Sequence, residues 1–135
     1  MKVLLDTNIL LSAALFPNGI AAQAYIKAVT FPNNGIVCEW SINELKNVFI
    51  RKFPDKLQAL DIFLSISFTA FDIIPTPTQE VSDEGKIRDI NDRPLLRAAQ
   101  INQVDILLTG DKDFLESSIT NPLILNPTQF LELNK

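Results

Sequence analysis

The chain has 135 residues, of which 47% are apolar and 21% are charged, and its formal net charge at pH 7 is −4. This length and apolar fraction predict one domain, residues 1–135, that can bury a core without disulfides or structural metals. An acidic chain lacks the excess of Lys and Arg by which proteins hold nucleic acid electrostatically, so any nucleic-acid chemistry must depend on a local site.

Missing residue types exclude several kinds of site. The chain has no histidine and one cysteine, Cys38, so Ser-His-Asp and Cys-His groups cannot form and zinc lacks its usual ligands. No GxGxxG or GxxxxGK[ST] loop is present to hold a nucleotide. No apolar run reaches the ~18 residues of a membrane span, and a lone cysteine, expected in the core, suits a reducing compartment. We therefore expect a cytoplasmic protein with no membrane association, whose main catalytic groups are carboxylates.

The first half of the chain alternates strand-like and helical patterns. Pro17 and Gly19 end the first helix, and Pro54 ends the third. In chain order the expected elements are a strand at 2–5, helices at 8–16 and 20–29, a strand at 36–40, and helices at 41–52 and 55–66.

The second half opens with a strand at 71–74 and a long polar segment at 75–91, punctuated by Pro and Gly, which we expect to be a loop. Loops of this length inside a compact domain are often functional. The remaining expected elements are a helix at 92–102, a strand at 105–109, a helix at 113–117, a strand at 123–125 and a helix at 127–133. Strands that alternate with helices predict a parallel sheet covered by helices on its faces.

Four acidic residues occupy equivalent places in this pattern. Asp6 follows the first strand in VLLDTNILLSA, and Asp111 follows the fourth in ILLTGDKDF. Glu44 lies in the first turn of the helix after the second strand, and Asp92 begins the helix after the third. Because the carboxyl ends of parallel strands share one edge of the sheet, we expect these four carboxylates to converge.

Converging carboxylates repel one another unless a cation lies among them. A set of oxygen ligands without histidine or thiolate suits Mg²⁺ or Mn²⁺. Such an ion lowers the pKa of a bound water and neutralises charge on a phosphoryl group, so no protein general base is required.

These motifs together resemble a family. DTN after the first strand, Glu44 in SINEL, Asp92 in NDRPLLRAA and the segment LLTGDKDF resemble the acidic constellation of PIN-domain ribonucleases, and the size resembles VapC-like toxins of bacterial toxin–antitoxin pairs. The resemblance covers essentially the whole chain. It implies a three-layer α/β sandwich with about five parallel strands, Mg²⁺- or Mn²⁺-dependent cleavage of RNA, inhibition by a cognate antitoxin, and a homodimer.

The resemblance also assigns roles to single residues. It implies that Asp6, Glu44, Asp92 and Asp111 bind metal and catalyse, with Asn8 and Thr109 as supporting groups. Asp113 is an expected outer ligand. Asp89 is an alternative to Asp92, and Asp113 an alternative to Asp111; we prefer Asp92 for the RPLLRAA that follows it, and Asp111 because it lies nearer the strand end.

Each residue also has a structural interpretation. Asp6 could cap a helix that begins at Asn8, Asp92 a helix start, and Asp111 a turn. Ser41 and Glu44 match the S-x-x-E capping box. The common pattern of the four acids favours the metal site.

Basic and aromatic residues have two interpretations as well. Arg93 and Arg97, four apart beside Asp92, could contact RNA phosphates or form a solvated helix face. The same choice applies to Lys46, Arg51 and Lys52. Trp40 and Tyr25 are expected in the core or an interface.

Two alternative functions remain on the residues alone. A phosphoaspartate receiver or phosphatase also places acids at strand ends, but a phosphatase requires an aspartate where Asn8 stands, and a receiver requires neighbouring acids where only Asp6 stands. A catalytically silent PIN-fold binding module would retain the fold without turnover.

Overall fold

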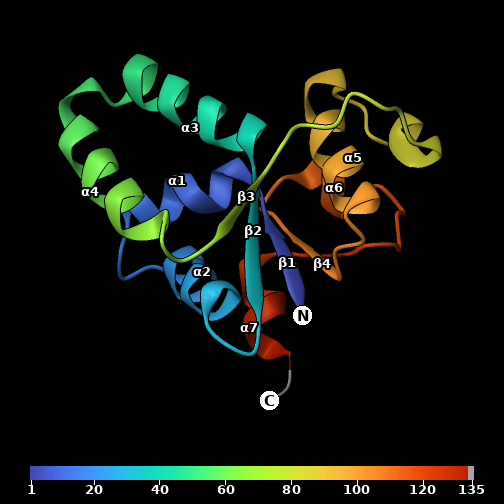
Figure 1. The fold of residues 1–135 in the computed structure, drawn as a ribbon, viewed down its shortest axis with the longest axis horizontal. Coiled ribbons are helices and arrows are strands. Elements are labelled where there is room, and N and C mark those ends of the chain that lie inside the picture. The colour runs from blue at the N-terminus through green and yellow to red at the C-terminus, as the bar shows by residue number, and fades with distance from the viewer. Residues whose placement is uncertain (134–135) are drawn as a thin grey trace.

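The structure, a computed structural model, describes residues 1–133 and contains a five-stranded sheet in which every pairing is parallel (Figure 1). The strand order is β3-β2-β1-β4-β5. The strands are β1 (Lys2–Leu5), β2 (Asn34–Cys38), β3 (Asp72–Ile74), β4 (Ile106–Leu108) and β5 (Leu123–Leu125).

Helices connect the strands. The α-helices are α1 (Thr7–Leu15), α2 (Ile20–Val29), α3 (Glu39–Lys52), α4 (Leu57–Ser67), α5 (Arg93–Ile101), α6 (Lys112–Leu115) and α7 (Pro127–Glu132). Short 3₁₀ helices are η1 (Pro54–Lys56), η2 (Ser82–Lys86) and η3 (Ile90–Asp92). The predicted loop at 75–91 is therefore a loop with 3₁₀ turns in its second part.

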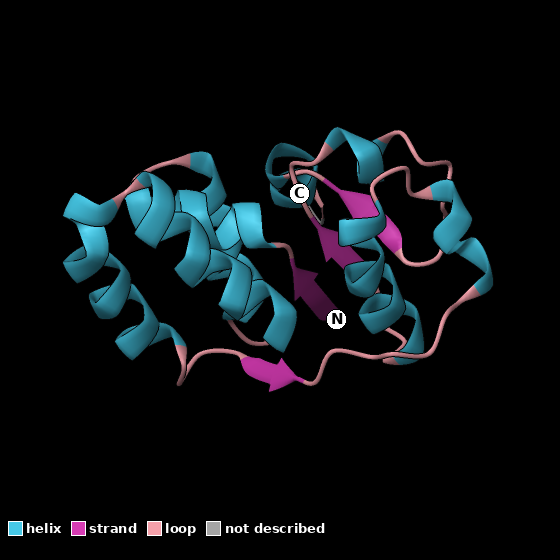
Figure 2. Cartoon of the chain, turned by 90° about the horizontal axis from the view of Figure 1, so that it is seen from above, coloured by secondary structure: helices cyan, strands magenta, loops and turns pink. Residues whose placement is uncertain are grey.

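The sheet separates two hydrophobic cores, because successive strand residues point to opposite faces. Val3 and Leu5 pack into one core with residues of α1, α2, α3, α4 and α7, whereas Leu4 packs into the other with residues of α5 and α6. Figure 2 shows the two groups of helices on either side of the strands. The predicted three-layer α/β sandwich is confirmed, as is the burial of Cys38 and Tyr25.

Strands are added to both sides of the central strand β1. It first builds β2 and β3 on one side, then crosses to β4 and β5 on the other. The boundary between β1 and β4 is thus the topological switch point, where ligands bind in parallel α/β sheets. Leu5 pairs with Leu108 in the register, so the residues that follow these two strands lie side by side.

The predicted boundary between the second strand and its helix was wrong. β2 ends at Cys38 and α3 begins at Glu39, so Ser41 is the third residue of the helix and no N-cap. The predicted capping box of Ser41 and Glu44 is therefore absent. Thr76 performs part of that task, because its hydroxyl accepts a hydrogen bond of 3.0 Å from the backbone amide of Trp40.

The helices are short relative to a bilayer. Within residues 1–133 no single helix is long and apolar enough to cross a membrane; α1 and α2 reach that length and composition only as a pair bent by 116°.

Candidate metal centre

Asp6 lies at the junction of β1 and α1, beside the switch point. Its side chain is buried and caps α1, accepting a hydrogen bond of 2.6 Å from the amide of Thr7. The helix begins at Thr7, one residue before the predicted start at Asn8. Its other carboxylate oxygen, Oδ2, accepts a hydrogen bond of 2.6 Å from the hydroxyl of Thr109. Asp6 is therefore both a helix cap and a link between β1 and β4.

Asn8 and Thr109 extend this link to the turn after β4. The side-chain amide of Asn8 donates to Asp6 at 3.3 Å, and its carbonyl accepts from the amide of Gly110 at 3.1 Å. The Thr109 hydroxyl accepts from the amide of Asp111 at 3.0 Å. Both predicted supporting residues thus contact the backbone or side chain of a predicted ligand.

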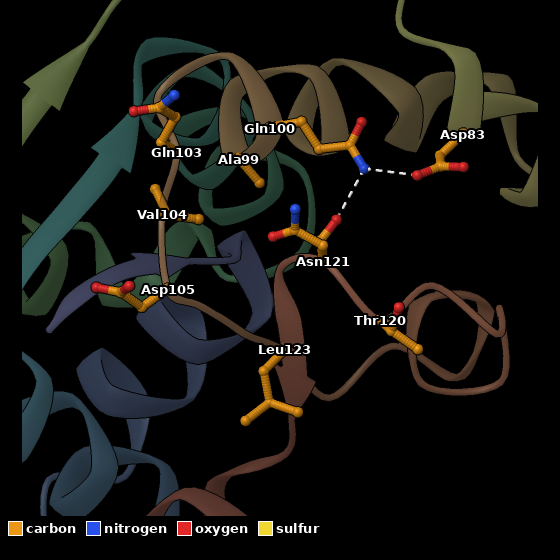
Figure 3. A pocket seen from close by; sticks show the side chains of 9 residues that line it. All are labelled: Asp83, Ala99, Gln100, Gln103, Val104, Asp105, Thr120, Asn121 and Leu123. Atoms are coloured by element: carbon orange, nitrogen blue, oxygen red, sulfur yellow. Dashed lines mark hydrogen bonds between the residues drawn. The ribbon is translucent and has the colours of Figure 1, made fainter.

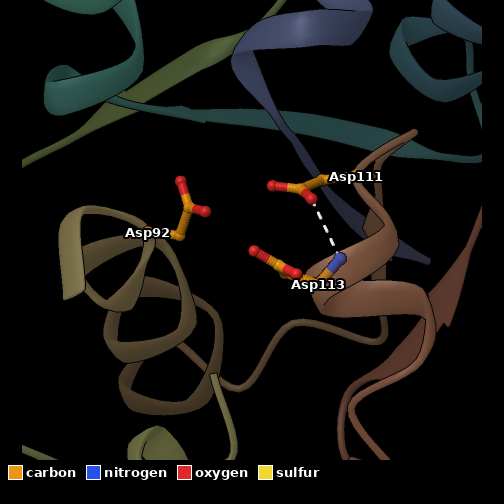
Figure 4. Close-up of side chains that lie close together, drawn as sticks. All are labelled: Asp92, Asp111 and Asp113. Carbon is orange, nitrogen blue, oxygen red and sulfur yellow. Dashed lines mark hydrogen bonds between the residues drawn. The ribbon is translucent and has the colours of Figure 1, made fainter. Parts of the chain in front are cut away.

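Three carboxylates converge beyond this turn. Each of Asp92, Asp111 and Asp113 offers an oxygen, and these oxygens lie within 4.8 Å of one another. Figure 4 shows Asp92, at the start of α5, facing Asp111 and Asp113, which come from the turn into α6. We call these residues the acidic trio. The backbone amide of Asp113 donates to the Asp111 carboxylate at 2.9 Å, so Asp111 also caps α6.

Asp6 and Glu44 lie outside this trio, but the two are close enough to affect the titration of nearby acids. Burial raises the pKa of Asp6 to about 6, opposed by the hydrogen bonds from Thr109 and Thr7 and supported by the charges of Glu44 and Asp111. Burial and the nearby Asp111 raise the pKa of Asp92 to about 7, with a further contribution from Asp6. Burial is the larger cause of both shifts, and the neighbouring carboxylates add to it.

The cap geometry distinguishes Asp92 from Asp89. Asp89 accepts a hydrogen bond from the amide of Asn91 and so stabilises the short helix η3. Asp92 makes no side-chain cap for α5 and faces the other acids instead. The structure therefore favours Asp92 over Asp89 as the residue that shares the site.

Two basic residues near the trio have protein partners. Arg97 forms a bidentate pair with the buried Glu84, with both contacts at 2.8 Å. Arg93 donates through Nε to the carbonyl of Ile87 at 3.1 Å. The predicted RNA contact of Arg97 thus competes with a structural ion pair.

Sequence reasoning missed Arg88 and Glu84. The exposed guanidinium of Arg88 pairs with Asp113, and Glu84 fastens the loop to α5 through Arg97. Both residues lie in a polar loop, where no periodic pattern signals which side chain will be buried.

One family model matches most of this chain. The family model of the PIN domain matches residues 2–113. The chain belongs to the PIN-domain family. The receiver and phosphatase alternatives are thereby set aside.

A solved PIN structure has the same fold. A chain of the crystal structure of VapBC2 from Rickettsia felis, bound to a DNA fragment from their promoter, is similar with a TM-score of 0.69 and 22% identity. The similarity covers 93% of this PIN domain and 98% of that chain. No curated protein sequence matches this chain.

A hollow lies at the opposite edge of the sheet from the acidic trio. It lies at the amino ends of β4 and β5 and is lined by residues that include Asp83, Gln100, Asp105 and Asn121 (Figure 3). Gln100 already donates to Asp83 at 2.9 Å and to the Asn121 carbonyl at 2.8 Å. In this PIN domain the polar groups of the hollow thus bond to one another, whereas the acidic trio lies at the switch point.

Proposed function

We propose that this PIN domain is a Mg²⁺- or Mn²⁺-dependent endoribonuclease that hydrolyses RNA phosphodiester bonds, and that it is the toxin of a toxin–antitoxin pair. The observation that carries the proposal is the acidic trio beside the switch point. Membership of the PIN-domain family supports the nuclease activity.

The residues present suit a hard divalent cation. The trio supplies only carboxylate oxygens, and Asp6 and Glu44 add two further carboxylates nearby. Part of the rise in the pKa values of Asp6 and Asp92 comes from neighbouring carboxylates, and a bound cation would offset that repulsion. When bound, Mg²⁺ or Mn²⁺ supplies an activated water and offsets charge on the phosphoryl group.

The protein's own residues position this site. Thr109 and Asn8 hold the carboxylate of Asp6, and Thr109 also holds the amide of Asp111. The exposed side chain of Arg88 forms an ion pair with Asp113 and can exchange this partner for a phosphate of the substrate. Asp113 is then free to contribute fully to metal binding.

Cleavage of single-stranded RNA by the purified protein tests the proposal. We expect cleavage with Mg²⁺ or Mn²⁺, no cleavage in EDTA, and loss of activity in Asp111→Asn and Asp92→Asn with the fold retained. Asp55→Asn, in the exposed η1, is the matched control and should remain active. Metal-independent cleavage, or full activity in both site variants, would contradict the proposal. Intact RNA under every condition would favour a silent binding module.

An antitoxin and a second copy of the chain are the proposed protein partners. The similar VapBC2 structure is a complex, and exposed apolar side chains on this chain, including Ile26, Ile62 and Ile66, suit a protein partner. Light scattering tests the homodimer, and co-purification with the product of the neighbouring reading frame tests the antitoxin. A cytoplasmic location follows from the RNA substrate.

A further inference from the structure

A polar groove leads away from the acids along α3. It is lined by Trp40, Asn43, Glu44, Asn47 and Arg51 of α3, with Asn91 of η3 also contributing. Its volume of about 440 Å³ lies in the range of ligand pockets. Figure 1 places the start of α3 directly after β2, near the edge of the sheet that carries the acids. Glu44 belongs to both the groove and the predicted acidic set, so the two are continuous.

Three amide side chains meet in this groove from two different elements. Asn43 and Asn47 are four residues apart and thus lie on one face of α3, while Asn91 comes from η3. None of the three side chains hydrogen-bonds to another residue in the part of the chain that the structure describes. Each amide carries both a donor and an acceptor, the combination that reads the edge of a nucleobase.

Arg51 supplies a positive charge at the far end of the groove. It lies seven residues beyond Glu44, about 10 Å along the helix axis at the usual rise. Its side chain is exposed and forms no ion pair with any of residues 1–133. An unpaired guanidinium here suits a backbone phosphate of a strand that passes through the acidic site.

We propose that this groove binds a nucleotide next to the cleaved phosphate of a single-stranded RNA, with Asn43, Asn47 and Asn91 reading the base and Arg51 holding a phosphate. The proposal rests on the ribonuclease function and adds the residues that set its sequence preference. Single-stranded RNA is the substrate class, because its unstacked bases expose the edges that such amides bind.

The test compares cleavage-site preference in matched variants. A pool of single-stranded RNA with random sequence is cleaved with Mn²⁺, and the new ends are sequenced. The variants are the double change Asn43→Ala with Asn47→Ala, and Arg51→Ala. Gln58→Ala on α4 and Lys56→Ala on η1 are the controls, because both positions are exposed and outside the groove. Alanine favours helix more than asparagine does, so the double variant should keep its fold.

We expect the wild type to prefer one base at a position beside the cut. That preference should fall about five- to tenfold in the double asparagine variant. Arg51→Ala should keep the preference and raise KM several-fold, whereas both controls should behave like the wild type. Mn²⁺ affinity, measured by calorimetry, should be the same in all five proteins.

The outcomes separate the groove from the nuclease activity. Base reading by the groove is overturned if the double variant keeps the wild-type base preference, or if its cleavage is reduced equally for every base. Either result leaves the ribonuclease function intact. Should the wild type leave RNA uncut, the ribonuclease proposal fails, and selection of bound RNA with Ca²⁺ then decides on the groove. Base reading is supported if the RNA bound by the wild type is enriched in one base and the RNA bound by the double variant is not. It is overturned if the wild type enriches no base, or if both proteins enrich the same base equally.

Discussion

The hydroxyl of Thr109 donates a hydrogen bond of 2.6 Å to the carboxylate of Asp6 across 103 positions of the sequence. The same hydroxyl accepts from the amide of Asp111. One buried side chain therefore fixes two of the predicted ligands relative to each other.

Replacement of Thr109 by valine should remove this link at nearly constant volume. We expect the free energy of unfolding to fall by about 1.5–3 kcal/mol, because the buried Asp6 loses a donor and the Asp111 amide an acceptor. The pKa of Asp6 should rise further, since the Thr109 hydrogen bond lowers it. Urea denaturation measures the stability, and Thr109→Ser, which keeps the hydroxyl, should lose less than half as much. No loss in Thr109→Val would contradict the prediction, and equal losses in both variants would show that the methyl group contributes as much as the hydrogen bond.

Asp6 and Asp92 should make the metal-free protein less stable as the pH rises. The folded protein retains protons on Asp6 up to about pH 6 and on Asp92 up to about pH 7, whereas the unfolded carboxyls lose them near 3.8. These two groups therefore reduce stability as pH rises from about 4 to about 7, and add no further loss above that. Melting temperatures in EDTA at pH 5, 6, 7 and 8 measure the effect.

Asp92→Asn gives the matched comparison for this pH effect. The variant should show a smaller decline between pH 5 and pH 7, because one of the two raised groups is gone. Metal binding should release more protons at pH 6 than at pH 8, as calorimetry in buffers of different ionisation enthalpy reports. Proton release that is equal at both pH values would contradict the raised pKa values.

Ser41 and Glu44 should respond to substitution in opposite ways. The Ser41 hydroxyl is buried and has no hydrogen-bond partner among residues 1–133. Ser41→Ala should therefore leave the free energy of unfolding equal or higher, by up to about 1 kcal/mol. A true N-cap would lose about 0.5–2 kcal/mol. Glu44→Gln should keep its melting temperature and lose metal-dependent cleavage. A fully active Glu44→Gln would remove Glu44 from the site.

The ion pair of Glu84 and Arg97 should hold the loop against α5. Both side chains are largely buried, so removing one partner leaves a charge without its counter-ion. Arg97→Met should lower the free energy of unfolding, because Glu84 loses both of its hydrogen bonds to the guanidinium. The double variant Glu84→Met with Arg97→Met should recover much of this loss. Denaturation of the four proteins gives the coupling energy, and additive losses would rule out a direct interaction.

The sequence predicted the layers, the parallel sheet and the identity of the helices, because apolar runs and helical spacing are local signals. From connectivity it also predicted that Asp6, Glu44, Asp92 and Asp111 would converge at one edge. Asp92 and Asp111 meet in the acidic trio, whereas Asp6 and Glu44 lie outside it. The predicted start of α3 was wrong because a residue distant in the sequence takes part in its first turn. Thr76, 36 residues from Trp40, supplies the acceptor for an amide in the first turn, and no nearby residue signals this.

The role of Asp113 was also beyond local reasoning. In GDKD both aspartates suit a turn, and only the folded chain brings an oxygen of each within 4.8 Å of an oxygen of Asp92. Likewise, four-residue spacing placed Arg93 and Arg97 on one helix face, but the partner of Arg97 is Glu84, 13 residues earlier in a polar loop. Side-chain pairing of this kind depends on how the loop folds over the helix.

The order in which the acids occur along the chain has a consequence for protein synthesis. Asp6 is translated long before its partner Thr109 and the trio member Asp113. β1 cannot pair with β4 until residue 108 has been added. The ribosome must therefore extend the chain by 103 positions beyond Asp6, to Thr109, before these two residues can meet.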